Sequence, residues 1–123
     1  MKRILIVDDA ATVRLYHRGI LEAADYMVDE AVNGVEALEK ALQQHYDLYL
    51  VDINMPVLDG YGFLRQLRSQ PGAQAPAIMI STEAQAHDRL KAYQAGANLY
   101  IVKPTRPDAL LLHVRLMLGE AAR

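Results

Sequence analysis

Short aliphatic runs recur along this chain and alternate with segments whose apolar residues recur every three or four positions. The first run, Ile4–Val7, is too short for a helix and is apolar throughout, which is typical of a strand buried on both faces of a parallel sheet. The next segment, Thr12–Ala24, has helical spacing. Its expected inward face consists of Val13, Tyr16, Ile20, Leu21 and Ala24. This alternation predicts βαβ units with right-handed crossovers and helices on both faces of the sheet.

The same pattern predicts five strands and five helices. The expected strands are Ile4–Val7, Met27–Val32, Leu48–Val51, Ala77–Ile80 and Leu99–Val102. The expected helices are Thr12–Ala24, Val35–Leu42, Gly60–Gln70, Ala84–Ala95 and a last one that ends at Leu118. Thr105 is expected to cap the last helix with its hydroxyl, and Pro107 to lie in its first turn. The fold class is therefore α/β, with a doubly wound, five-stranded parallel sheet.

Composition narrows the class of protein. A length of 123 residues with 52% hydrophobic residues is enough for one domain with a sizeable core. The net charge is −2 and the basic residues are scattered, which argues against direct nucleic-acid binding. No apolar run approaches the roughly 20 residues of a membrane span, and the absence of cysteine fits a reducing compartment. We therefore expect a cytoplasmic, monomeric protein without membrane contacts.

Polar residues directly follow four of the five aliphatic runs. Asp8 and Asp9 follow the first run, Asp52 the third, Ser81 the fourth and Lys103 the fifth. Taken singly, each has an ordinary explanation, such as a solvated loop charge or a helix cap. Together they are more informative, because the carboxyl ends of parallel strands meet at one edge of the sheet, where sites form. We therefore expect these side chains to lie close together.

Three carboxylates at one edge would repel one another unless a cation lay between them. Oxygen-only ligands suit Mg²⁺, which favours sites where a phosphoryl group completes its coordination shell. With that charge neutralised, Asp52 can act as a nucleophile toward phosphorus. Lys103 and the Ser81 hydroxyl would then supply positive charge and a hydrogen bond to the phosphoryl oxygens. The residues predict phosphoryl capture on Asp52.

Five motifs resemble the receiver domain of bacterial two-component response regulators, particularly its CheY-like single-domain members. The motifs are Ile6-Val7-Asp8-Asp9, Val51–Pro56 with Asp59-Gly60, Met79–Ala84, Ala95-Gly96-Ala97 and Tyr100–Pro104. This resemblance implies a flavodoxin-like sheet with strand order 2-1-3-4-5. It also implies one receiver domain over residues 1–123 without an output domain. Such a domain is a signalling switch, and its chemistry is limited to its own phosphorylation and dephosphorylation.

The resemblance also implies roles for the site residues. Asp52 would accept a phosphoryl group from a phosphohistidine of a sensor histidine kinase, and Lys103 would contact the phosphoryl oxygens. The peptide between Lys103 and Pro104 would be cis. The implied Mg²⁺ ligands are Asp9, Asp52 and the backbone carbonyl of Asn54, with Asp8 acting through water. Asn54 and Glu83 together imply moderately fast loss of the phosphoryl group.

The implied switch links the phosphorylation site to a surface. Ser81 would turn toward the phosphate and Tyr100 would rotate inward, because the new charge shifts the conformational population. The readout would be the face of the fourth helix, fifth strand and fifth helix. Its candidate partner residues are His87, Arg89, Tyr93, Tyr100 and His113. For Tyr93, partial burial on an amphipathic helix is as good an explanation as contact with a partner. Thr105 departs from the family, which often has an aromatic residue there, so the output surface is expected to differ.

The sequence is compatible with several roles. Chemotaxis, with the flagellar motor switch as the target, is preferred over a phosphate sink or a phosphorelay intermediate. A phosphatase with an aspartate nucleophile would need an acid where this chain has Asn54. A flavodoxin-like electron carrier would need a hydroxyl-rich glycine loop after the first strand. The four histidines share no metal-binding motif and are expected on the surface.

Overall fold

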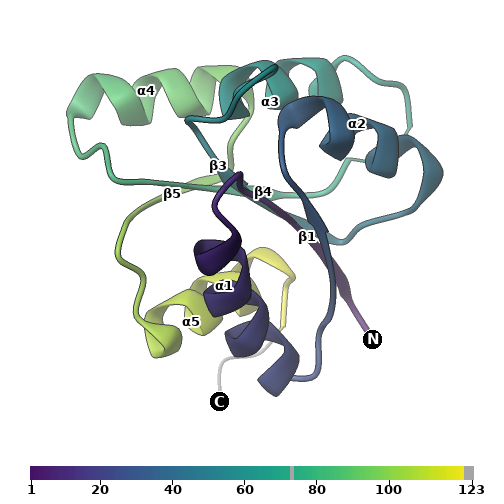
Figure 1. Ribbon diagram of the computed structural model, residues 1–123, viewed down its shortest axis with the longest axis vertical. Coiled ribbons are helices and arrows are strands. Elements are labelled where there is room, and N and C mark those ends of the chain that lie inside the picture. Colours follow the sequence, from purple (N-terminus) through teal and green to yellow (C-terminus); the bar gives the residue numbers. More distant parts are fainter. Residues whose placement is uncertain (73, 121–123) are drawn as a thin grey trace.

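A computed structural model describes residues 1–72 and 74–120 and contains one five-stranded sheet (Figure 1). The strands are β1 (Arg3–Val7), β2 (Met27–Ala31), β3 (Leu48–Asp52), β4 (Ala77–Ser81) and β5 (Leu99–Val102). The helices are α1 (Ala11–Ala23), α2 (Gly34–Gln43), α3 (Gly60–Arg68), α4 (Ala86–Ala95) and α5 (Pro107–Met117). All strand pairs are parallel, and the order is β2-β1-β3-β4-β5. Both the predicted fold class and the predicted strand order are confirmed.

Helices cover both faces of the sheet. Helices α2, α3 and α4 lie on one side, and α1 and α5 lie on the other (Figure 1). Leu5 and Phe63 belong to the core under the first group, whereas Ile4 and Leu110 belong to the core under the second. Successive strand residues therefore enter different cores, as the two-residue period of a strand requires. This explains why the strands are apolar throughout.

The inward faces of α1 and α2 differ from the expected ones. In α1, Leu21 is buried, but Tyr16 is 46% exposed and His17, at 3%, is buried instead. His17 and Leu21 are four residues apart and so lie on one face of the helix. The expectation that every histidine lies on the surface was therefore wrong for His17. In α2, Val35 and Leu42 are exposed, although they belong to the apolar residues whose helical spacing predicted this helix.

The start of α5 also departs from expectation. Pro107 is the first helical residue, as predicted, but Arg106 occupies the cap position and no side chain caps the helix. Thr105 lies one residue earlier and is buried. Its hydroxyl is 3.0 Å from Nε2 of His17 and so bonds to a neighbouring helix. The predicted hydroxyl cap was wrong because this tertiary contact takes up the Thr105 side chain.

Most predicted element ends agree with the structure to within one residue. The larger departures are that α4 begins at Ala86 and that α3 ends at Arg68. Within the described ranges 1–72 and 74–120, no helix combines the length and apolar character needed to span a bilayer.

The loop between β3 and α3 contains an unusual backbone conformation. Val57 has a φ of 71°, and the Leu58 amide donates a hydrogen bond to the Pro56 carbonyl at 2.8 Å. Positive φ is unfavourable for a β-branched residue because its Cβ crowds the backbone. The Val57 side chain is 81% exposed, so burial does not compensate for this cost. The strain lies in the segment that follows Asp52.

We expect Val57→Asn to stabilise the protein by about 0.5–1 kcal/mol, because asparagine tolerates positive φ better than valine does. Urea unfolding of the wild type and the variant would measure this change. Val35→Asn is the matched control, because Val35 is partly exposed in the regular helix α2 and no gain is expected there. A Val57→Asn midpoint at or below that of the wild type would contradict the argument.

Candidate functional site

Three carboxylates meet at the carboxyl edge of the sheet, as the sequence predicted. Asp8 and Asp9 follow β1, and Asp52 ends the neighbouring strand β3. Each of the three offers an oxygen atom, and these atoms all lie within 4.8 Å of one another. Asp8 is buried, Asp52 is partly buried and Asp9 is exposed. The cluster therefore has a solvent-accessible side and a side closed by the protein.

Lys103 joins the cluster from the other half of the sheet. Its Nζ atom lies 3.2 Å from Oδ2 of Asp8 and 3.1 Å from Oδ1 of Asp52. Its backbone amide donates a 2.7 Å hydrogen bond to the Ser81 carbonyl, and the Lys103–Pro104 peptide is cis, as the resemblance implied. The ammonium is thus fixed between two carboxylates that are far from it in sequence.

Burial and charge alter the ionisation of this pair. Burial raises the pKa of Asp52, the negative charge of Asp8 raises it further, and Lys103 only partly offsets these effects. Burial acts against the charged form of Lys103, but Asp52 and Asp8 outweigh it and raise the pKa of the ammonium. Lys103 is therefore charged at neutral pH, and a second cation would further favour ionised Asp52.

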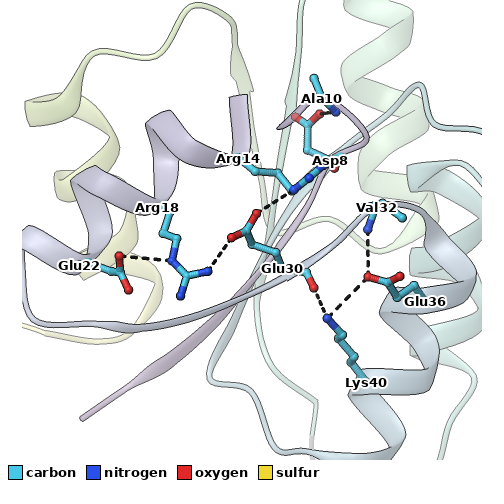
Figure 2. Close-up of polar contacts among 9 residues, drawn as sticks. All are labelled: Asp8, Ala10, Arg14, Arg18, Glu22, Glu30, Val32, Glu36 and Lys40. Atoms are coloured by element: carbon cyan, nitrogen blue, oxygen red, sulfur yellow. Dashed lines mark hydrogen bonds and ion pairs between the residues drawn. The ribbon is translucent and has the colours of Figure 1, made fainter. Parts of the chain in front are cut away.

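Both the side chain and the backbone of Asp8 are held at the start of α1. Its Oδ1 accepts a hydrogen bond from the Ala10 amide at 2.9 Å, and its carbonyl oxygen accepts one from Nη1 of Arg14 at 2.8 Å. Nε of Arg14 donates to the Glu30 carboxylate at 2.8 Å (Figure 2). Arg14 therefore links the first aspartate of the site to the edge strand β2.

Glu30 is the centre of a wider network that sequence reasoning missed (Figure 2). Arg18 also donates to its carboxylate, at 2.5 Å, and Lys40 donates to its carbonyl oxygen. The hydrogen bond from Arg18, assisted by the one from Arg14, lowers the pKa of Glu30 despite partial burial. A signal was present in the sequence, because Arg14 and Arg18 are four residues apart and share one face of α1.

The donor set of the cluster fits a hard divalent cation. All three clustered side chains offer carboxylate oxygens, which Mg²⁺ prefers, and none offers nitrogen or sulfur. The exposed position of Asp9 leaves room for the water molecules that Mg²⁺ usually retains. Asp8, Asp9 and Asp52 are therefore suitable ligands.

Ser81 and Tyr100 lie beside the site with their hydroxyls already engaged. The Ser81 side chain is buried, and its oxygen accepts a hydrogen bond from the Glu83 amide at 3.1 Å. The Tyr100 ring is 4% exposed, and its hydroxyl donates to the Glu83 carbonyl at 2.7 Å. Asn54 Nδ2 lies 3.5 Å from Oε1 of Glu83. The segment around Glu83 thus connects the candidate switch residues.

The expected partner surface is only partly exposed. His87, Arg89 and Tyr93 are exposed on α4, and His113 is half-buried on α5. Tyr100 is buried, so its inclusion among the surface residues was wrong for this conformation. The Arg89 guanidinium lies 5.2 Å from the centroid of the Tyr100 ring, within the range of a cation–π contact. Arg89 therefore covers the ring that the surface was expected to display.

Comparison with known proteins finds similarity both in sequence and in fold. The transcriptional regulatory protein ResD of Bacillus subtilis is 40% identical over 121 residues, which are 98% of this chain and 50% of ResD. The chain thus spans about half of that relative. The structure of the chemotaxis protein CheY4 of Vibrio cholerae matches with a TM-score of 0.90 and 33% identity, over 95% of this chain and 98% of that one.

A third match concerns a metal. The receiver domain of sensor histidine kinase PA1611 from Pseudomonas aeruginosa, described with a magnesium ion coordinated in the active site cleft, has a TM-score of 0.89. It is 32% identical, and the match covers 97% of this chain and 98% of that one. The family model of the response regulator receiver domain matches residues 4–115. The chain therefore belongs to the receiver domain family of two-component response regulators.

Proposed function

We propose that this receiver domain takes a phosphoryl group from a phosphohistidine of a sensor histidine kinase onto Asp52. The observation that carries this proposal is the fixed position of the Lys103 ammonium, which lies within 3.2 Å of both Asp8 and Asp52 at the carboxylate cluster. A carboxylate nucleophile beside a fixed positive charge suits the capture of a negatively charged phosphoryl group.

In the proposed reaction, an oxygen of Asp52 forms a bond to phosphorus while the bond between phosphorus and the imidazole nitrogen breaks. The electron pair of the broken bond stays on the imidazole. Lys103 then contacts the phosphoryl oxygens and offsets their charge, which a loose transition state spreads over three atoms. Ser81 would supply a further hydrogen bond once its hydroxyl leaves the Glu83 amide.

Mg²⁺ is the proposed cofactor. Asp9, Asp52 and the Asn54 carbonyl would hold it, with Asp8 acting through water, and the ion would neutralise charge between nucleophile and phosphoryl group. The oxygen-only donor set and the magnesium described for the PA1611 receiver domain support this assignment.

The proposed output is a change of the α4–β5–α5 face. Phosphorylation replaces the single negative charge of the Asp52 carboxylate by the roughly two charges of a phosphoryl group, which favours the conformation in which Ser81 and Lys103 meet the phosphoryl oxygens. Chemotaxis, with the motor switch as the target, is our first choice, because the match to CheY4 covers nearly all of both chains. A phosphate sink or a relay intermediate is the alternative, supported by the receiver domain of a sensor kinase among the matches. A cytoplasmic location fits either role.

Phosphorylation with acetyl phosphate tests the proposal. We expect intact-mass measurement to show the addition of one phosphoryl group with Mg²⁺ present and none after removal of divalent ions with EDTA. Decay over minutes after removal of the donor is expected, because by resemblance Asn54 and Glu83 occupy the positions that tune hydrolysis of the acyl phosphate in this family. Equal modification with and without Mg²⁺ would contradict the metal assignment, and no modification by either acetyl phosphate or a phosphorylated kinase would contradict the function.

A further inference from the structure

The loop that carries Lys103 is attached to α1 by two hydrogen bonds at a single residue. The Tyr16 hydroxyl donates to the Thr105 carbonyl at 2.7 Å, and Nε2 of His17 lies 3.0 Å from the Thr105 hydroxyl. Tyr16 and His17 are adjacent in α1, while Thr105 is two residues beyond Lys103. Main chain and side chain of Thr105 are thus held by the same helix.

The hydrogen bond between His17 and Thr105 is buried. His17 is 3% exposed and Thr105 is 6% exposed, so water does not compete freely for either group. Burial lowers the pKa of His17, and the nearby Lys103 lowers it further, against the opposing effect of Asp8. The imidazole is therefore neutral at neutral pH. Loss of its partner would leave a buried polar atom unsatisfied, which is costly.

Packing holds this loop less closely on one side. An open groove of about 360 Å³ lies between α1 and the loop, and Val13, Tyr16, His17, Lys103 and Thr105 are among its lining residues. Tightly packed side chains leave few voids larger than a water molecule, so an open space of this size provides little steric restraint. On the side of this groove, the two hydrogen bonds from α1 therefore restrain the loop in place of close packing.

We propose that Tyr16, His17 and Thr105 form a latch that positions the Lys103 ammonium for phosphoryl capture on Asp52. The latch residues do not touch the phosphoryl group and act through the position of Lys103. This inference rests on the proposed function of Asp52. Thr105 follows the Lys-Pro pair, where the chain has no aromatic residue to anchor the loop by packing. The hydrogen bonds of the latch hold the loop at this same position.

Two mild substitutions test the latch. Thr105→Val removes the hydroxyl and keeps the size of the side chain, and Tyr16→Phe removes the second hydrogen bond and keeps the ring. We expect each to lower the rate constant of phosphorylation by acetyl phosphate about tenfold, as misplacement of a catalytic group does. The rate at saturating donor should fall while the half-saturating donor concentration changes little. Thr105→Ser should react at the wild-type rate, because serine keeps the hydroxyl that Thr105→Val removes.

A second measurement does not depend on phosphorylation. The ammonium signal of Lys103 in an NMR spectrum reports its contacts with Asp8 and Asp52, because contact with two carboxylates slows its exchange with solvent. We expect faster exchange in Thr105→Val and wild-type exchange in Thr105→Ser. Thr12→Val is the control, because Thr12 lines the same groove and its hydroxyl makes none of the hydrogen bonds found among residues 1–72 and 74–120.

The outcomes separate the two proposals. Slower phosphorylation and faster exchange in both latch variants, with rescue by Thr105→Ser, would support the latch. Wild-type rate and exchange in Thr105→Val would overturn it while leaving phosphoryl capture intact. If the wild type accepts no phosphoryl group, the proposed function fails, and the exchange of the Lys103 ammonium alone decides whether the latch positions it.

Discussion

Replacement of Asp52 by asparagine is expected to abolish phosphorylation. The amide oxygen is a much weaker nucleophile than a carboxylate, and the substitution also removes one of the two charges that hold Lys103. Intact-mass measurement after incubation with acetyl phosphate and Mg²⁺ should show full modification of the wild type and none of Asp52→Asn. Asp108→Asn is the matched control, because the exposed Asp108 lies on α5 and should leave phosphorylation unchanged.

The stability of this variant distinguishes lost chemistry from lost folding. Burial and Asp8 raise the pKa of Asp52 in the folded protein, so stability falls as the pH rises from the ordinary pKa of aspartate through the raised one, and the full cost of the ionised form is present above the raised pKa. Asparagine removes this charge, and Lys103 retains its contact with Asp8 at 3.2 Å. We therefore expect Asp52→Asn to unfold at neutral pH at an equal or higher urea concentration. Full phosphorylation of Asp52→Asn would show that another residue is the acceptor.

The arrangement of the acidic cluster was predictable because it depends on topology. Asp8 and Asp52 each follow a buried strand, and parallel pairing of those strands places their ends at one edge regardless of how the helices pack. The position of Lys103 follows from the same rule, since β5 ends at that edge too. The alternation of strands and helices along the sequence is therefore sufficient to predict that these residues lie close together.

The surroundings of the cluster were not predictable in the same way. Whether Tyr16 or His17 faces inward depends on the rotation of α1 about its axis. The spacing of apolar residues is compatible with either residue on the inward face. The bond between His17 and Thr105 joins residues 88 positions apart, and it decides that Thr105 does not cap α5. The network around Glu30 likewise depends on the packing of α1 beside β2. Such contacts require side-chain orientations that sequence periodicity does not contain.

Gly60→Ala is expected to disrupt both the fold and the site. A Cβ atom at Gly60 would lie 2.2 Å from the carbonyl oxygen of Asp52 and 3.1 Å from Cα of Ile53, and these are backbone atoms that cannot rotate away. The Gly60 amide also donates to the Ile53 carbonyl at 2.8 Å, so the start of α3 is fixed against the end of β3. Relief of the clash must therefore move the backbone that carries the proposed nucleophile.

We expect this substitution to lower the free energy of unfolding by about 1–3 kcal/mol, the usual cost of overpacking. Urea unfolding would measure this loss. The phosphorylation rate should fall by about a hundredfold, since displacement of a reacting group by about 1 Å has that effect. Gly60→Ala should therefore remain folded at low urea and yet react slowly, which separates the displacement of Asp52 from general unfolding.

Gly19→Ala provides the matched control for this prediction. Gly19 lies in the interior of α1, and a Cβ atom there would meet no other atom within 4 Å. Alanine should stabilise that helix by about 0.5–1 kcal/mol and leave the phosphorylation rate unchanged. Opposite effects of the same chemical change would show that the contact with Asp52, and not the added methyl group, is responsible. If Gly60→Ala matches the wild type in both stability and rate, the close packing of α3 against Asp52 does not constrain the site.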